Sequence, residues 1–214
     1  MKIALTGGIA CGKSLVAKFL RELGVQTLDA DDVVHELEAP GGAAIPAIVA
    51  RFGQSVLAPD GGIDRVKLAA LVFTGEARKE GRRPGGTPLQ ALEAILHPLV
   101  RQRLLDFARP PPVPRSPFPI SLAIIPLLFE SHFDSDYDII LCVSSTEDRQ
   151  IDRMMQTRGY TREQAEARLA AQMPVAEKAA RADWTIQNNS TVEELKAEVQ
   201  RCVAWLSARM EKVV

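Results

Sequence analysis

The feature that most constrains this chain is the octapeptide from Gly7 to Ser14, which reads Gly-Gly-Ile-Ala-Cys-Gly-Lys-Ser. It matches the phosphate-loop pattern G-x-x-x-x-G-K-[ST] at every fixed position. A short apolar segment, 2–5, precedes the octapeptide, and apolar residues at helical spacing follow it over 15–23. A loop between a strand and a helix is the context that the pattern requires. The sequence therefore predicts a nucleotide-binding P-loop fold rather than a glycine-rich turn with an incidental lysine.

The composition of this loop suits the binding of phosphate. A loop with few side chains lets successive backbone N–H groups surround a phosphate, and the positive end of the following helix adds attraction. Lys13 is expected to reach the β- and γ-phosphates, and the hydroxyl of Ser14 to coordinate Mg²⁺. The nucleotide-binding residues are therefore expected to be Gly8, Ile9, Ala10, Cys11, Gly12, Lys13, Ser14 and Leu15.

The rest of the chain alternates apolar strands with helical patterns, which predicts a three-layer α/β/α domain with a parallel sheet. Pro98 interrupts one helical stripe and should kink or restart that helix. Gly24 lies where the first helix should end, at a position that favours a positive φ. Strands are expected at 2–5, 25–28, 120–125, 138–143 and 184–187, helices at 15–23, 89–104, 146–157, 162–173, 175–182 and 192–210, and loops at 75–88 and 110–119.

Composition excludes several classes of protein. The 214 residues include 26 Lys or Arg and 27 Asp or Glu, and the net charge of −1 gives no overall attraction to nucleic acid or to an anionic membrane. The longest apolar stretch, 120–129, contains a proline and is too short to span a membrane. Three widely spaced cysteines and the lack of an apolar leader lead us to expect a cytoplasmic protein in a reducing compartment.

Nucleotide binding alone leaves signalling, mechanical work and phosphoryl transfer open. GTP-binding switches usually recognise guanine through Asn-Lys-x-Asp, whereas no Lys-x-Asp follows Asn188 or Asn189, the two asparagines of this chain. ATPase motors usually end an apolar strand with a metal-binding Asp, whereas the two central strands here continue into Pro126 and into Ser144-Ser145. A small-molecule kinase is therefore the leading class.

A kinase also needs a carboxylate near the acceptor hydroxyl and positive charge on the transferred phosphoryl group. Asp29, Asp31 and Asp32 follow the strand expected at 25–28, which we place beside the phosphate-loop strand, so that Asp31 would face the γ-phosphate. The arginine-rich segment 149–168 is expected to form a mobile lid that brings an arginine to ATP. Capping of the next helix and solvated ion pairs are the alternative interpretations of these residues.

Several blocks of residues, taken together, resemble the dephospho-CoA kinase family. The phosphate loop is general, whereas the Asp-Ala-Asp, His-Pro and Pro-Leu-Leu-Phe-Glu blocks are specific in combination. They occur in the family's order over residues 2 to about 190, at Ala4–Ile9, Gly12–Ser14, Leu28–Asp31, Leu96–Leu99, Pro126–Glu130, Arg153–Gln172, Ala182–Asp183 and Asn188–Asn189. The resemblance implies the last step of coenzyme A synthesis, in which ATP phosphorylates the ribose 3′-hydroxyl of dephospho-CoA.

The resemblance also implies roles for individual residues. Asp31 matches the acidic residue that activates the 3′-hydroxyl, and Arg153 matches a lid arginine that approaches ATP. With Lys13, these two form the expected catalytic set. His97 belongs to the acceptor side and would bind substrate together with Asp31, and Glu130 would order water or metal.

The organisation that the resemblance implies is a single kinase-like domain over 1–214. Its nucleotide core would comprise about 1–30, 118–145 and 183–214, its helical acceptor-side region about 31–109, and its lid about 146–182. The expected substrates are ATP and dephospho-CoA with Mg²⁺ as cofactor, without nucleic acid or membrane partners, in a monomer or small homo-oligomer.

The phosphate loop departs from the family's usual Gly-Ser-Gly, because this chain has Ala10-Cys11-Gly12. Ala10 is expected to require a negative φ. Cys11, at a helix N-terminus, is expected to have a lowered pKa and to be oxidisable. Leu15 replaces a common threonine, which leaves Ser14 as the sole hydroxyl candidate for the metal. Two alternatives stay open: another P-loop kinase of a nucleoside or metabolite, and a non-catalytic nucleotide-binding regulatory module.

Overall fold

The computed structural model describes residues 1–73, 87–109 and 120–211. The chain divides into two compact units, each with a hydrophobic core of its own. Unit 1 comprises Met1–Asp29 and Leu105–Val214, and unit 2 comprises Ala30–Leu104. No helix among the described residues is long and apolar enough to cross a membrane.

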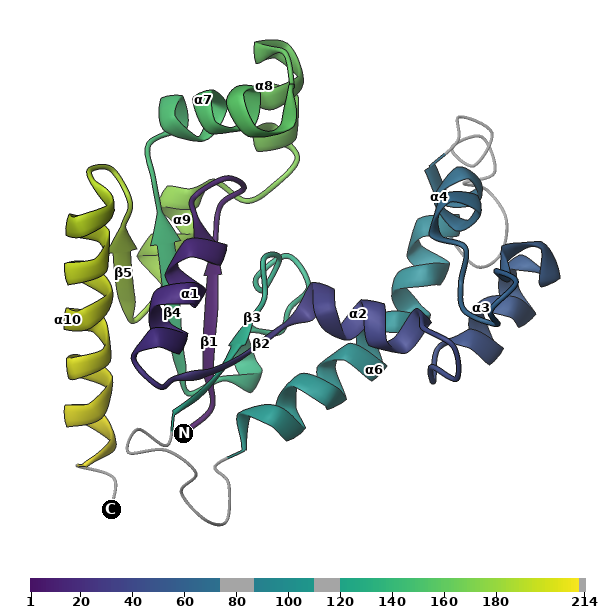
Figure 1. Cartoon of the computed structure of the whole chain (residues 1–214), viewed down its shortest axis with the longest axis horizontal. Coiled ribbons are helices and arrows are strands. Elements are labelled where there is room, and N and C mark those ends of the chain that lie inside the picture. The colour runs from purple at the N-terminus through teal and green to yellow at the C-terminus, as the bar shows by residue number, and fades with distance from the viewer. Residues whose placement is uncertain (74–86, 110–119, 212–214) are drawn as a thin grey trace. The chain divides into compact units, whose positions relative to one another are not determined.

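Unit 1 is built on a five-stranded parallel sheet with the order β2-β3-β1-β4-β5 (Figure 1). The three central strands are buried on both faces, as the interior strands of a parallel sheet are. Their carboxyl ends lie at one edge of the sheet, where the phosphate loop begins. The strands are β1 (Ile3–Gly7), β2 (Gln26–Asp29), β3 (Ser121–Ile124), β4 (Ile139–Ser144) and β5 (Trp184–Gln187).

The place of β2 corrects one expectation. We expected the strand that leads to Asp31 to lie beside the phosphate-loop strand, but β2 pairs with β3, and β3 lies between β2 and β1. The physical reason is the composition of the two strands. All four residues of β3 are buried, whereas β2 begins with the exposed Gln26 and is only half-buried after it, which suits an edge strand.

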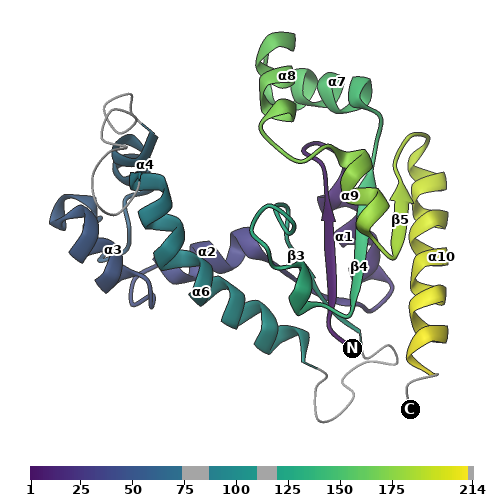
Figure 2. The same cartoon turned by 180° about the vertical axis from the view of Figure 1, so that it is seen from behind.

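Helices cover both faces of this sheet and complete the expected three layers. On one face, α1 (Lys13–Glu22) and α10 (Val192–Met210) pack side by side and share the core with the strands (Figure 1). On the other face, α9 (Val175–Arg181) packs against β4 and β1 (Figure 2). Gly24 follows α1 with a φ of 86°, as the sequence predicts. The expected α/β/α arrangement is therefore confirmed.

Two further helices connect β4 to α9. They are α7 (Glu147–Arg158) and α8 (Arg162–Ala170), which pack on each other around Ile151, Met154 and Ala165. Gly159, with a φ of 66°, ends α7, and a capping box of Thr161 with Gln164 begins α8. A short 3₁₀ helix, η2 (Asp134–Asp136), lies between β3 and β4.

Unit 2 is helical, and its core is formed mainly by aliphatic side chains. Its elements are α2 (Ala30–Glu38), α3 (Ile45–Phe52), the 3₁₀ helix η1 (Gln54–Val56), α4 (Arg65–Phe73) and α6 (Pro88–Ala108), whose last turn belongs to unit 1. An ion pair between Arg65 Nε and Glu38 Oε2, 2.7 Å apart, joins α4 to the end of α2.

The sequence predicts a kink or a restart at Pro98, and the helix α6 continues through this residue without a restart. It also begins at Pro88, inside the segment expected as a loop, because Thr87 and Gln90 cap it reciprocally through side-chain and backbone groups. The rest of that expected loop, 75–86, and the expected loop 110–119 lie outside the described residues.

Candidate functional site

The phosphate loop connects β1 to α1 and begins α1 without a capping side chain. The N-cap residue is Gly12, with a φ of 93°. The first backbone N–H groups of a helix have no intrahelical partner, so an anion can accept hydrogen bonds from them. First-turn acidic residues, which would compete with such an anion, are absent from α1. This helix N-terminus is therefore suited to bind phosphate.

Ala10 corrects the expectation about backbone geometry in this loop. Its φ is 56°, in the left-handed region, and not negative as the sequence interpretation required. This conformation costs an L-residue about 1 to 2 kcal/mol. The surrounding contacts account for its persistence, since the carbonyl oxygen of Ala10 accepts a hydrogen bond from Arg153 and its side chain packs beside the core of α7 and α8. The phosphate loop thus forms with alanine at this position.

Lys13 folds back over the loop that it follows. Its Nζ donates hydrogen bonds to the carbonyl oxygens of Gly7, at 2.9 Å, and Gly8, at 2.8 Å. Burial lowers the pKa of Lys13, and the positive charge of Lys178 lowers that pKa further. A phosphate in the loop would restore the favourable charge balance around this ammonium group.

Cys11 contradicts the expectation of a reactive thiol. Its side chain is buried, and burial raises its pKa, although the nearby positive charge of Lys13 partly opposes that shift. A helix N-terminus lowers a cysteine pKa when the sulfur is accessible to solvent, whereas here desolvation of the thiolate dominates. The expected lowered pKa is therefore wrong, and Cys11 is a buried hydrophobic residue of the loop.

Arg153 lies against the phosphate loop, on the α7 helix. Its guanidinium donates hydrogen bonds to the carbonyl oxygen of Ala10 at 3.2 Å, to Oγ of Ser145 at 3.4 Å and to the carbonyl oxygen of Asn188 at 3.0 Å. The structure thus brings Arg153 together with the loop that contains Lys13. By contrast Arg149, one turn earlier in α7, is exposed.

Ser14 occupies the first turn of α1, next to Lys13, and is exposed. Mg²⁺ in nucleotide sites is commonly held by one or two protein oxygens together with phosphates and water. Among the described residues, no group of three or more His, Cys, Asp or Glu side chains is arranged to hold a metal. A single hydroxyl beside an anion-binding loop fits a metal that arrives with its nucleotide, so the residues present fit the group.

Asp31 and His97 belong to unit 2, whereas the residues described so far belong to unit 1. Asp31 lies in the first turn of α2, directly after β2, together with Asp32. Both carboxylates are favourably placed for the dipole of that helix. His97 precedes Pro98 within α6.

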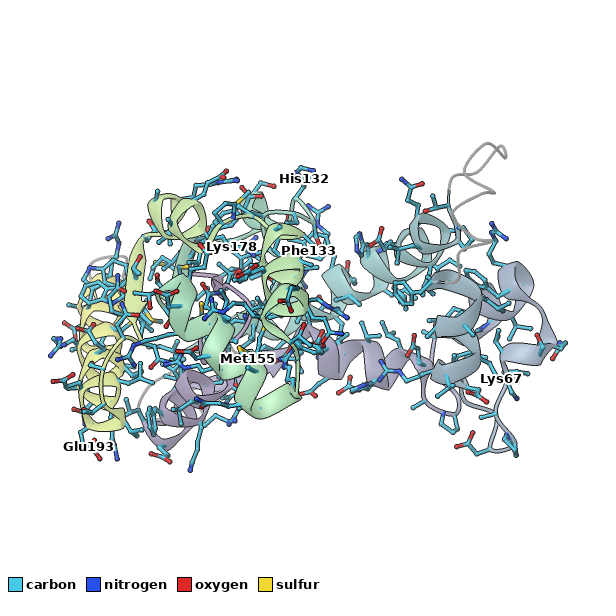
Figure 3. All side chains as sticks on the ribbon, turned by 90° about the horizontal axis from the view of Figure 1, so that it is seen from above. Lys67, His132, Phe133, Met155, Lys178 and Glu193 are labelled. Carbon is cyan, nitrogen blue, oxygen red and sulfur yellow. The ribbon has the colours of Figure 1, made fainter. Side chains whose placement is uncertain are left out.

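Glu130 lies after β3 and contacts α9 and the residues that precede it. Its Oε1 accepts hydrogen bonds from Nζ of Lys178 at 2.7 Å and from the backbone N–H of Met173 at 3.1 Å. Its Oε2 is buried and has no hydrogen-bond partner within the described part of the chain. Lys178 is completely buried and also donates to the carbonyl oxygen of Pro126 at 2.9 Å, and Figure 3 shows it within α9, away from the edge of the unit where Glu193 lies.

A cavity of about 760 Å³ opens beside the phosphate loop. This volume lies in the range of cofactor and ligand sites. Its walls come from the loop, the end of β4, the helices α7, α8 and α9 and the segment after β5, with the residues Gly8, Ile9, Ser144, Ser145, Thr146, Glu147, Gln150, Glu166, Leu169, Ala170, Gln172, Met173, Pro174, Val175, Ala176 and Asn189. The cavity therefore lies among these three helices and the carboxyl edge of the sheet.

Three residues of this site have no role that the sequence predicts. Gln150 donates to the carbonyl oxygen of Ile9, Asn188 donates to that of Cys11, and Lys178 pairs with Glu130. Gln150 and Lys178 are single polar residues within helices, where nothing distinguishes them from a solvated face. Asn188 had a signal, because it directly follows a strand of a parallel sheet, at the edge where ligands bind.

Comparison with known proteins identifies similar sequences along nearly the whole chain. A family model described as dephospho-CoA kinase matches residues 1–194. A curated dephospho-CoA kinase of Geobacillus kaustophilus is 43% identical over 199 residues, which are 93% of this chain and 93% of that protein. One of Geobacter sulfurreducens is 41% identical over 199 residues, 92% of this chain and 94% of that protein.

Solved structures agree in fold. The crystal structure of TT1252 from Thermus thermophilus has a TM-score of 0.71 and 30% identity, covering 97% of this chain and 96% of that one. A dephospho-CoA kinase from Campylobacter jejuni has a TM-score of 0.67, with 96% of each chain covered, and at 24% identity it bears on the fold alone.

Proposed function

Because the chain belongs to the dephospho-CoA kinase family, we propose that it transfers the γ-phosphoryl group of ATP to the ribose 3′-hydroxyl of dephospho-CoA. The products are coenzyme A and ADP, and the reaction is the last step of coenzyme A synthesis. The observation that carries this proposal within the molecule is the phosphate loop, with Lys13 and Arg153 both within hydrogen-bond distance of its backbone. Phosphoryl transfer depends mainly on positioning and on neutralisation of charge, which is what such a loop supplies.

The proposed roles divide binding from chemistry. The backbone N–H groups of residues 8–15 bind the phosphates, and Nζ of Lys13 exchanges its two carbonyl partners for phosphate oxygens. Arg153 contributes positive charge from the lid. Asp31 accepts the proton of the 3′-hydroxyl, and His97 binds the acceptor. Lys13 is partly buried, so its ammonium group meets an anion with less competition from water and its charge acts more strongly on the phosphate.

We also propose Mg²⁺ as the cofactor, with the hydroxyl of Ser14 as its protein ligand. When bound, the metal would neutralise charge on the phosphates and orient them. The proposal rests on the exposed hydroxyl beside the phosphate loop. The partners are the small molecules ATP and dephospho-CoA, and a net charge of −1 gives no overall attraction to nucleic acid or membrane. The proposed setting is cytoplasmic, because three free cysteines fit a reducing compartment.

The test is the release of ADP from purified protein with ATP and Mg²⁺, in parallel reactions with dephospho-CoA, adenosine, AMP and pantothenate as acceptors. We expect release that depends on dephospho-CoA and is lost in Lys13→Ala. Turnover with a different acceptor alone would assign another kinase activity to the same fold. ATP binding without turnover on any acceptor would instead indicate a regulatory module.

A further inference from the structure

We infer that Gln150 and Asn188 are positioning residues, which hold the phosphate loop in the conformation that binds anions. The inference deepens the proposed function, because it concerns how the same loop receives ATP. Neither residue is proposed to be catalytic. Each acts through the backbone of the loop.

The five carbonyl oxygens of residues 7–11, in the phosphate loop, all accept hydrogen bonds from side chains of the protein. Those of Gly7 and Gly8 accept from Lys13, and that of Ala10 accepts from Arg153. The remaining two depend on amide side chains from distant parts of the sequence. Nε2 of Gln150 donates to Ile9 at 2.6 Å, and Nδ2 of Asn188 donates to Cys11 at 2.8 Å.

The direction of these carbonyls decides which way the loop presents its N–H groups. In a planar trans peptide, the C=O of one residue and the N–H of the next point to opposite sides. A donor that fixes the carbonyl of Ile9 therefore also fixes the N–H of Ala10, and a donor on Cys11 fixes the N–H of Gly12. A carbonyl that rotated towards the ligand would place negative partial charge against phosphate and remove a donor from it.

The two amides lie against the loop where it lacks side chains. A Cβ on Gly8 would be 2.6 Å from Nε2 of Gln150, and a Cβ on Gly12 would overlap Nδ2 of Asn188. Both contacts would be closer than two nonbonded atoms can approach. The loop glycines thus make room for these amides as well as for a phosphate.

Both amides are themselves held firmly. Their residues are 2% and 6% exposed, so loss of the hydrogen bond would leave a buried donor unsatisfied. The backbone N–H of Asn188 donates to Ser144, and its carbonyl accepts from Oγ of Ser145 and from Arg153. Gln150 belongs to the first turn of α7, directly after β4. Two different segments, the start of α7 and the residue that follows β5, therefore hold the loop through its carbonyl oxygens.

The test compares Gln150→Met and Asn188→Leu, which keep the volume and remove the donor, with the wild-type protein. Binding of ATP and of adenosine is measured by equilibrium titration, and melting temperature is measured alongside. Adenosine carries the base and the ribose without phosphate. We expect the Kd for ATP to rise between about 10-fold and about 100-fold, as is typical of a misplaced binding group, with the Kd for adenosine unchanged.

The matched control is Gln156→Met, which changes an exposed glutamine of the same helix. It should bind ATP as the wild type does. An unchanged Kd for ATP in both variants, or equal rises for ATP and adenosine, would overturn the inference. If the apolar replacements do not fold, Gln150→Asn and Asn188→Ser are subjected to the same titrations and the same criterion.

These titrations need no acceptor, so they distinguish failure of the proposed function from failure of the positioning inference. If wild-type protein binds ATP but does not phosphorylate dephospho-CoA, the proposed function fails while the positioning inference is still tested by binding. If turnover with dephospho-CoA is found and the variants bind ATP normally, the positioning inference alone fails.

Discussion

Lys178 and Glu130 form a buried ion pair between two segments that lie 48 residues apart in the sequence, with Nζ and Oε1 separated by 2.7 Å. The lysine side chain is completely buried, and the glutamate is partly exposed. The pair joins α9 to the segment that follows β3. The positive charge of Lys178 also reaches the phosphate loop, where it lowers the pKa of Lys13.

The first prediction concerns stability. Lys178→Met should lower the free energy of unfolding by about 3 to 5 kcal/mol, because it leaves the carboxylate of Glu130 without its cation. Urea unfolding measures the change. The double variant Lys178→Met with Glu130→Gln should lose less than the sum of the two single changes, since it removes the unpaired charge. Arg162→Ala, in an exposed pair with Glu166, serves as the control and should cost at most about 1 kcal/mol. Strict additivity would contradict the coupling.

The second prediction concerns the proposed base. Asp31→Asn should lower kcat by about 100-fold or more and leave the Kd for ATP nearly unchanged, because the amide cannot accept the proton of the acceptor hydroxyl. Asp32→Asn, in the same first turn of α2, is the matched control and should retain kcat near that of the wild type. Steady-state kinetics with varied ATP and dephospho-CoA distinguish the two. Equal loss in both variants would assign the effect to the helix terminus and not to a base.

The third prediction concerns the left-handed residue of the phosphate loop. Ala10→Gly should change the free energy of unfolding by less than about 1 kcal/mol, because relief of the positive φ is offset by greater freedom of the unfolded chain. Ala10→Val should instead destabilise the protein and weaken ATP binding, since a β-branched residue disfavours this conformation strongly. Urea unfolding and ATP titration of the pair provide the measurement. A stable Val variant with normal ATP binding would show that the loop adopts another conformation.

The fourth prediction concerns alkaline pH. Burial raises the pKa of Cys142 and of Cys202 to about 12 each. An unfolded thiol ionises near pH 8.5. Above that pH the unfolded chain binds fewer protons than the folded chain, so the free energy of unfolding falls as the pH rises towards 12.

The variant Cys202→Ala isolates the contribution of one of these thiols. Between pH 8 and pH 10 its free energy of unfolding should fall less than that of the wild type, by about 2 kcal/mol. Any cavity left by the substitution lowers stability equally at both pH values and therefore cancels from this difference. Equal falls in the two proteins would show that Cys202 does not stay protonated in the folded state.

The sequence by itself determined the features that depend on residues close together along the chain, namely the phosphate loop and the buried strands. The octapeptide from Gly7 to Ser14 predicts a strand, a phosphate loop and a helix, because its residue types restrict the backbone there. The apolar stretches around 120–125 and 138–143 likewise predict buried parallel strands, since only such strands are apolar on both faces. The resemblance of several short blocks of residues to one family predicts the reaction as well.

Tertiary structure decided what depends on residues far apart. The order of strands placed β3 between β1 and β2, which no local pattern of β2 specifies. The positive φ of Ala10 and the raised pKa of Cys11 follow from packing around the loop, because burial and hydrogen bonds there override the preferences of each residue alone. Gln150, in α7, and Asn188, directly after β5, contact the same loop only in the folded chain. Their contribution to holding the loop exists only in the folded chain, because each buried amide acts through the carbonyl oxygen to which it donates.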